Sequence, residues 1–121
     1  MMAGYDQMEE SSKEAYSVRV TRDFARIAFI GTLRLQGRPD YEKIHRMLRY
    51  AAQRSGDSLE IDLRQLQFLN SSGISTFSLF IIEMRDIGKK ITITGSKTIA
   101  WQSKSLANFR RLYDKVVVNL V

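Results

Sequence analysis

The sequence predicts a single α/β domain with a mixed sheet of about five strands and three or four helices. The 121 residues suffice for one hydrophobic core but not for two ordinary domains. Short segments of alternating apolar residues, typical of strands, are interleaved with longer segments of helical periodicity. After an opening antiparallel hairpin, helices between successive strands imply β-α-β crossovers and therefore parallel strands.

The first fifteen residues are expected to form a flexible acidic tail. Residues 1–15 are polar, lack periodicity and contain four acids against one lysine, a charge of −3. Because the whole chain carries +6, the predicted domain at 16–121 carries +9. These positive charges are scattered, which favours a solvated surface, although a basic domain can also attract nucleic acid, an anionic membrane or an acidic protein.

An antiparallel hairpin opens the domain, and a helix follows it. Apolar and polar residues alternate over 16–21 and again over 24–35, with a polar turn between them. Pro39, the only proline, stands where its fixed backbone angle suits the start of a helix. Apolar residues at helical spacing continue to about Ala51, and Gly56 can take the left-handed conformation that ends the helix.

The second half of the domain repeats strand and helix. Alternation over 59–63 predicts a central strand, and an apolar stripe over 71–87 predicts a helix that Gly88 ends. The remaining elements are expected at about 91–95 (strand), 101–113 (helix) and 116–120 (strand). The order is therefore β-β-α-β-α-β-α-β.

The candidate functional site is the stretch in which the central strand passes into the second helix. Asn70 is a favoured capping residue, and Ser71, Ser72 and Gly73 are small and either polar or flexible. A helix amino terminus has unpaired N–H groups and a positive dipole end. The sequence therefore predicts exposed hydroxyl groups at a positive helix end, where they either only cap the helix or also serve a function.

The same stretch resembles the signature of STAS domains, in particular the bacterial anti-sigma factor antagonists. In that signature, a strand ending in Asp-Leu is followed by an apolar residue, Asp-Ser-Ser-Gly, a second apolar residue and a helix. This chain has Asp62-Leu63 and then Phe68-Leu69-Asn70-Ser71-Ser72-Gly73-Ile74. The opening hairpin, the apolar segment with Gly31 and the strand at 91–95 also follow the order of the family. The resemblance covers residues 16–121 and implies a single STAS-like domain.

The resemblance implies a phosphorylatable protein-binding switch in bacterial signal transduction and transcription regulation. The antagonists are phosphorylated on the first serine of the motif, so the implied acceptor is Ser71, with Ser72 as the second choice. The implied partners are a protein serine kinase that is also the anti-sigma factor, and a PP2C-type phosphatase. The unphosphorylated form would bind its partner and the phosphorylated form would release it. The implied partner-binding loop and helix start consist of Asn70, Ser71, Ser72, Gly73 and Ser75.

Two departures from the family pattern affect this expectation. Asn70 replaces the usual aspartate and removes a negative charge beside the acceptor, and Arg34 follows Gly31 where relatives have acidic residues. The alternative hypothesis is a non-phosphorylated STAS scaffold that binds another protein, a nucleotide or a transporter component. In that case Ser71 only caps the helix.

The composition argues against catalysis and against a bound metal or cofactor. The chain has no cysteine and one histidine, His45, so thiolate chemistry and a structural zinc site are not expected. It lacks the glycine-rich phosphate loop and the nucleophile elbow, and a serine without a base is inert. We therefore predict no catalytic residue, cofactor or metal ligand, and we expect His45 to be solvated.

No nucleic-acid partner and no membrane span are predicted either. Trp101-Gln102 and 109–113 mix aromatic and basic residues, which can form an RNA surface, but packing of the last helix is the favoured interpretation. The longest apolar run, about 79–82, is far too short to span a bilayer, and the amino terminus lacks the features of a signal peptide. We expect a cytoplasmic protein that is a monomer or, through an exposed edge strand, a weak dimer.

Overall fold

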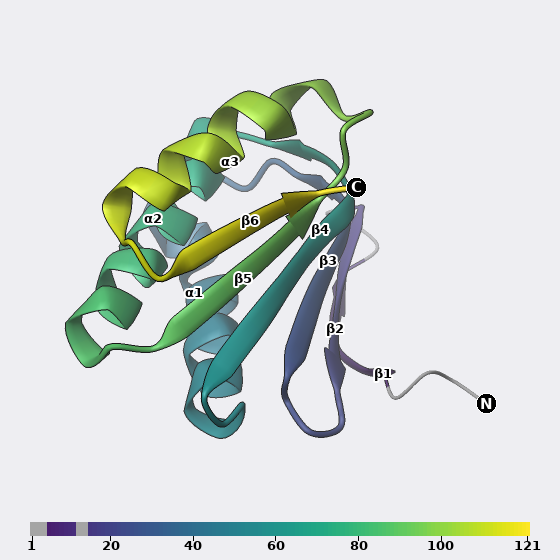
Figure 1. The fold of residues 1–121 in the computed structure, drawn as a ribbon. Coiled ribbons are helices and arrows are strands. Elements are labelled where there is room, and N and C mark those ends of the chain that lie inside the picture. The colour runs from purple at the N-terminus through teal and green to yellow at the C-terminus, as the bar shows by residue number, and fades with distance from the viewer. Residues whose placement is uncertain (1–4, 12–14) are drawn as a thin grey trace.

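The computed structural model contains a mixed sheet with helices packed on one of its faces (Figure 1). It describes residues 5–11 as a strand and residues 15–121 in full. The six strands of this part are β1 (Tyr5–Ser11), β2 (Tyr16–Thr21), β3 (Arg26–Leu33), β4 (Ser58–Leu69), β5 (Lys90–Gly95) and β6 (Val116–Leu120), and they lie in this order across the sheet. The three helices are α1 (Gly37–Arg54), α2 (Ser71–Ile87) and α3 (Ala100–Leu112).

The predicted fold class is confirmed. Strands β2 and β3 form the expected antiparallel hairpin, and the pairs β3–β4, β4–β5 and β5–β6 are parallel. Each parallel pair is joined through one helix, which gives three β-α-β crossovers. No helix in the described part of the chain is both long and apolar enough to cross a membrane.

The amino-terminal segment differs from the prediction of a flexible tail over 1–15. Residues 5–11 form strand β1, which pairs antiparallel with β2. The edge of β2 offers a row of backbone N–H and C=O groups that an extended segment can pair without contributing apolar side chains, so periodicity did not reveal it. Residues 1–4 and 12–14 of the expected tail lie outside the described residues.

The hydrophobic core lies between the sheet and the three helices. Strand β4 is central to it, because its apolar side chains Leu59, Ile61, Leu63 and Leu66 are all fully buried. Phe29 of β3 meets Phe77 of α2 edge to face, with ring centroids 5.2 Å apart. The opposite face of the sheet, called here the open face, is not covered by a helix of the described chain (Figure 1).

Strand β4 is longer than the predicted strand at 59–63, because helix α3 replaces a neighbouring strand. Pairing of β4 with β5 ends at Asp62, but β4 continues along β3 to Leu69. The Gln102 amide donates to the carbonyl oxygens of Leu63 and Leu66, at 2.6 and 3.1 Å. Trp101 Nε1 also donates to the oxygen of Leu66, at 3.2 Å. The packing interpretation of Trp101 and Gln102 is thus confirmed, and these bonds direct β4 toward the start of α2.

Candidate functional site

The candidate site lies where β4 passes into α2. Asn70 is the N-cap of α2, and its Oδ1 accepts a hydrogen bond from the N–H of Gly73 at 3.0 Å, as the capping prediction requires. Ser71 and Ser75 are exposed, Ser72 is half-buried and Gly73 is buried. The hydroxyl that the resemblance marks for phosphorylation is therefore open to solvent at the first position of the helix. Its phosphorylation remains a prediction.

The Asn70 side chain joins three segments of the chain. Its Oδ1 also accepts a hydrogen bond from Tyr41 Oη at 2.6 Å, and its Nδ2 donates to the carbonyl oxygen of Leu35 at 2.8 Å. An aspartate could accept both of the bonds at Oδ1 but could not donate to Leu35. The hydrogen bond to the Leu35 carbonyl, which precedes α1, therefore explains why position 70 holds asparagine and not aspartate.

Tyr41 is a buried residue of α1 that holds the N-cap residue of α2 through a hydrogen bond. Its side chain is 1% exposed, and burial raises the pKa of Tyr41 to about 12, so the phenol stays protonated and donates to Asn70. Gly73 packs against the same phenol, because an added Cβ would lie 2.7 Å from Tyr41 Oη and 2.2 Å from Leu69 Cδ1. Sequence reasoning missed Tyr41, since it occupies one apolar position among several in α1 and has no motif of its own.

The surroundings of the helix start are basic and aromatic. Arg34 directly follows β3 and Phe68 is the second-last residue of β4, so both lie at the carboxyl ends of these strands, where α2 begins. The Arg34 guanidinium carbon lies 4.7 Å from the centroid of the Phe68 ring, and Phe68 is 38% exposed. Helix α2 has no acidic residue in its first turn, so no carboxylate there offsets the positive dipole end. We call Arg34, Phe68, Asn70, Ser71 and Ser75 the helix-start surface.

His45 is buried and paired, which corrects the expectation of a solvated histidine. It is 5% exposed, and its Nε2 lies 2.9 Å from Glu83 Oε1 of α2. Arg49 binds both oxygens of Glu83, at 3.1 and 2.7 Å, and chiefly this contact holds the pKa of Glu83 below its usual value. The cluster links α1 to α2. Glu83 is twelve residues from Ser71, about 18 Å along the helix, so the pair cannot serve Ser71 as a base.

Asp62, the aspartate of the strand motif, lies on the open face and not at the helix start. It is 6% exposed and accepts three hydrogen bonds from Arg64, from the backbone N–H at 3.1 Å, Nε at 2.9 Å and one terminal nitrogen at 2.7 Å. Burial raises the pKa of Asp62, but the hydrogen bonds from Arg64 outweigh it and bring this pKa below 3.8. No group of three or more metal-ligating side chains occurs within residues 15–121.

Replacing Asp62 with asparagine should make stability less dependent on pH in the acid range. Because the pKa of Asp62 is lower in the folded protein, its ionised form stabilises the fold above the unfolded-state pKa, and this contribution is lost as the pH falls through the folded-state value. We expect the variant to lose about 1–2 kcal/mol at pH 7 and progressively less toward pH 3. Urea unfolding across this range measures the difference, with exposed Asp57→Asn as control. A pH-independent difference would contradict the prediction.

Solved structures of one bacterial protein share this fold. SiaC of Pseudomonas aeruginosa matches with a TM-score of 0.69 at 12% identity, covering 96% of this chain and 99% of SiaC. A chain of the complex of the P. aeruginosa diguanylate cyclase SiaD with its activator SiaC also gives 0.69, at 11% identity, with 96% and 99% covered. Apo-SiaC of P. aeruginosa gives 0.65 at 13% identity, with 94% and 98% covered. No family model and no curated protein matches the sequence.

The expected STAS-like fold is thereby confirmed over nearly the whole chain, but the implied partners need correction. SiaC is the activator of a diguanylate cyclase, whereas the resemblance to anti-sigma factor antagonists implied a serine kinase/anti-sigma factor and a PP2C-type phosphatase. The physical reason is that a fold sets where a surface lies but not its chemistry. In this chain, Asn70 and Arg34 stand where the antagonists carry acidic groups.

Proposed function

We propose that this chain, which has the fold of SiaC, is a non-catalytic cytoplasmic regulator that binds a diguanylate cyclase through its helix-start surface. The observation that carries the proposal is the fixed geometry of the exposed helix start. Asn70 is held by Tyr41 and Leu35 and in turn holds Gly73. A surface fixed in this way loses little conformational entropy when a partner binds. The partner class comes from the complex of SiaD with its activator SiaC.

Ser71 is the proposed regulatory position on this surface. Phosphorylation adds a charge of about −1.5 to −2 at pH 7. At the first position of α2 the helix dipole stabilises that charge, so the helix remains folded. The phosphate instead adds charge and bulk to the docking surface, which weakens binding through repulsion and desolvation. Amide spectra of the protein with phosphoserine at position 71 should therefore differ from those of the parent only near that residue.

Ser71→Glu should weaken binding to a diguanylate cyclase from the same genome by about tenfold or more, which corresponds to about 1.4 kcal/mol. The measurements are the dissociation constant by biolayer interferometry and the rate of cyclic dinucleotide formation with and without the regulator. Ser103→Glu is the matched control, because it places the same charge on an exposed serine near the start of α3. If both variants bound the cyclase as tightly as the parent, Ser71 would not be part of the docking surface. Failure of the parent to bind any such cyclase would reject the partner class.

The alternative is a scaffold that Ser71 does not regulate. The half-buried, hydrogen-bonded Asn70 side chain is compatible with it, since the cap would have the same structure in a protein that is never phosphorylated. The two possibilities differ in one observable. A regulated protein carries phosphate on Ser71 under some growth condition, as intact-mass analysis of protein from its native cells would reveal. A scaffold carries none, and its Ser71→Ala and Ser71→Glu variants bind alike.

A further inference from the structure

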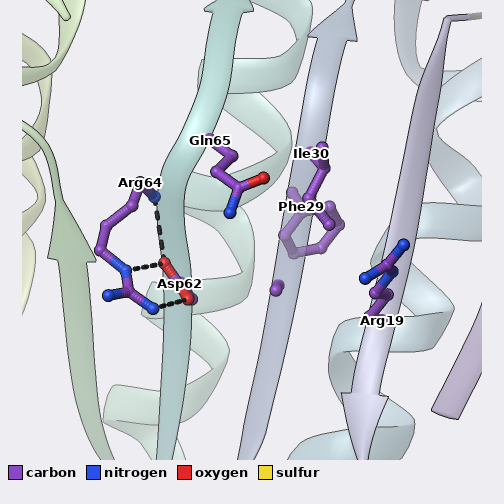
Figure 2. Close-up of a pocket in the computed structure, with 7 residues that line it drawn as sticks. Arg19, Phe29, Ile30, Asp62, Arg64 and Gln65 are labelled. Atoms are coloured by element: carbon purple, nitrogen blue, oxygen red, sulfur yellow. Dashed lines mark hydrogen bonds and ion pairs between the residues drawn. The ribbon is translucent and has the colours of Figure 1, made fainter. Parts of the chain in front are cut away.

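The open face of the sheet contains a hollow that the proposed function does not use (Figure 2). Its volume is approximately 140 Å³, and the residues that line it are Arg19, Ala28, Phe29, Ile30, Asp62, Arg64 and Gln65. Ala28 on β3 is the direct neighbour of Arg19 on β2 and of Asp62 on β4. Two strand spacings, roughly 9–10 Å, therefore separate Arg19 from Asp62. The methyl group of Ala28 is too short to fill the space between them.

A β-bulge in β4 shapes one wall of this hollow. Between the pairs Ala28–Asp62 and Ile30–Gln65, two residues of β4 oppose the single residue Phe29. Arg64, two residues after Asp62, lies on the same face and binds it, while the Gln65 amide points from β4 toward β3 (Figure 2). Bulges occur preferentially beside functional sites, where they redirect side chains. Here the bulge places an amide group at the rim of the hollow.

Among the side chains that the structure describes around the hollow, one cation has no partner. Asp62 is engaged by Arg64, and Glu60 binds Arg26 at 2.9 Å. Within residues 15–121, no hydrogen bond or ion pair involves the exposed side chain of Arg19. Within residues 15–121, the three arginines and two acids named here together carry a net charge of +1. An incoming group is therefore favoured if it is anionic.

We propose that this hollow binds a single glutamate side chain of an acidic partner protein, as a second contact surface separate from the helix start. The hollow is well below the roughly 300–1,000 Å³ of small-molecule sites, but it can hold one side chain. The glutamate carboxylate pairs with the Arg19 guanidinium, whose planar donors match its geometry, and accepts a hydrogen bond from the Gln65 amide. Its methylene groups lie on Ala28 and Ile30. Because Ala28 and Ile30 offer apolar contacts to these methylene groups, the hollow favours a glutamate side chain over a free inorganic anion.

The test is an NMR titration of the full chain with the blocked peptide acetyl-Gly-Glu-Gly-amide at constant ionic strength. We expect saturable shifts of the Arg19 Nε–Hε and Gln65 amide signals with a millimolar dissociation constant. The glutamine analogue of the peptide should bind at least tenfold more weakly. Inorganic phosphate that binds as tightly at the same signals would overturn the glutamate assignment in favour of a small-anion site. The absence of saturable shifts with the glutamate peptide would overturn the site itself.

Two variants test the geometry of the hollow. Ala28→Val fills it with a residue that suits a strand, and Arg19→Gln removes the exposed cation, so each should weaken peptide binding at least tenfold. Arg38→Gln, at an exposed position of α1, is the matched charge control and should bind like the parent. If Ala28→Val disturbs the fold, Arg19→Gln decides the result, and parent-like binding by it rejects the proposal. Ser71→Glu should leave this titration unchanged, which separates it from the proposed function.

Discussion

Replacing Gln102 with glutamate should lower the free energy of unfolding by about 3–5 kcal/mol at pH 7. Gln102 is fully buried, donates to the carbonyl oxygens of Leu63 and Leu66, and accepts from the N–H of Ser96 at 2.7 Å. Ionised glutamate keeps only the accepting role, so the Leu63 carbonyl loses this donor, the Leu66 carbonyl keeps only the bond from Trp101, and a charge is buried. Since these bonds direct β4 toward α2, the helix-start surface should lose its order as well.

Urea unfolding at pH 7 and pH 5 measures this effect, and pH provides an internal check. Burial should raise the folded-state pKa of the new carboxyl above its unfolded value of about 4.3. The destabilisation is then largest above the folded-state pKa and shrinks as the pH falls toward the unfolded value. Gln67→Glu makes the same change at an exposed position of β4 and should stay within about 0.5 kcal/mol of the parent. A loss below about 1 kcal/mol for Gln102→Glu would show that the amide does not hold β4.

Gly73→Ala should lower the free energy of unfolding by about 2–3 kcal/mol, although helix propensity alone predicts a gain of about 1 kcal/mol. Gly73 lies in the first turn of α2, where the added methyl would meet Leu69 Cδ1 at 2.2 Å and Tyr41 Oη at 2.7 Å. Both contacts are closer than side-chain packing allows. Leu69 or the helix start must therefore shift, and the bond from the Gly73 N–H to Asn70 lengthens.

Thermal or urea unfolding of Gly73→Ala, with Ser72→Ala as the control, tests whether the substitution lowers the free energy of unfolding or raises it as helix propensity predicts. Ser72 is the preceding residue in the same turn and is only half-buried, so its substitution should have little effect. Adding Tyr41→Phe to Gly73→Ala should not recover the loss, because Leu69 Cδ1 remains the nearest atom and the hydrogen bond from Tyr41 to Asn70 is removed as well. A Gly73→Ala protein as stable as the parent would mean that the packing beneath the cap adjusts freely.

The features that the sequence predicted correctly depend on neighbours in the chain. The cap formed by Asn70 on Gly73 spans three residues, and Gly88 ends α2 in the left-handed conformation at φ 74°. Both follow from local backbone chemistry. The prediction failed for β1, whose pairing depends on the free edge of β2, and for β4, whose length depends on α3. His45 was misplaced because its partner, Glu83, is 38 residues away.

Local patterns in the sequence were enough to predict the fold class, the order of the elements after β1, both caps of α2 and the exposed Ser71 at its start. The tertiary structure alone decided which distant groups meet: Tyr41 and Leu35 at Asn70, Gln102 at the carbonyls of β4, and Arg19 and Asp62 on either side of Ala28. Periodicity and capping act over a few residues, so they can be read along the chain. A buried polar group requires a partner, but the requirement does not specify which one, and only the packed fold selects it.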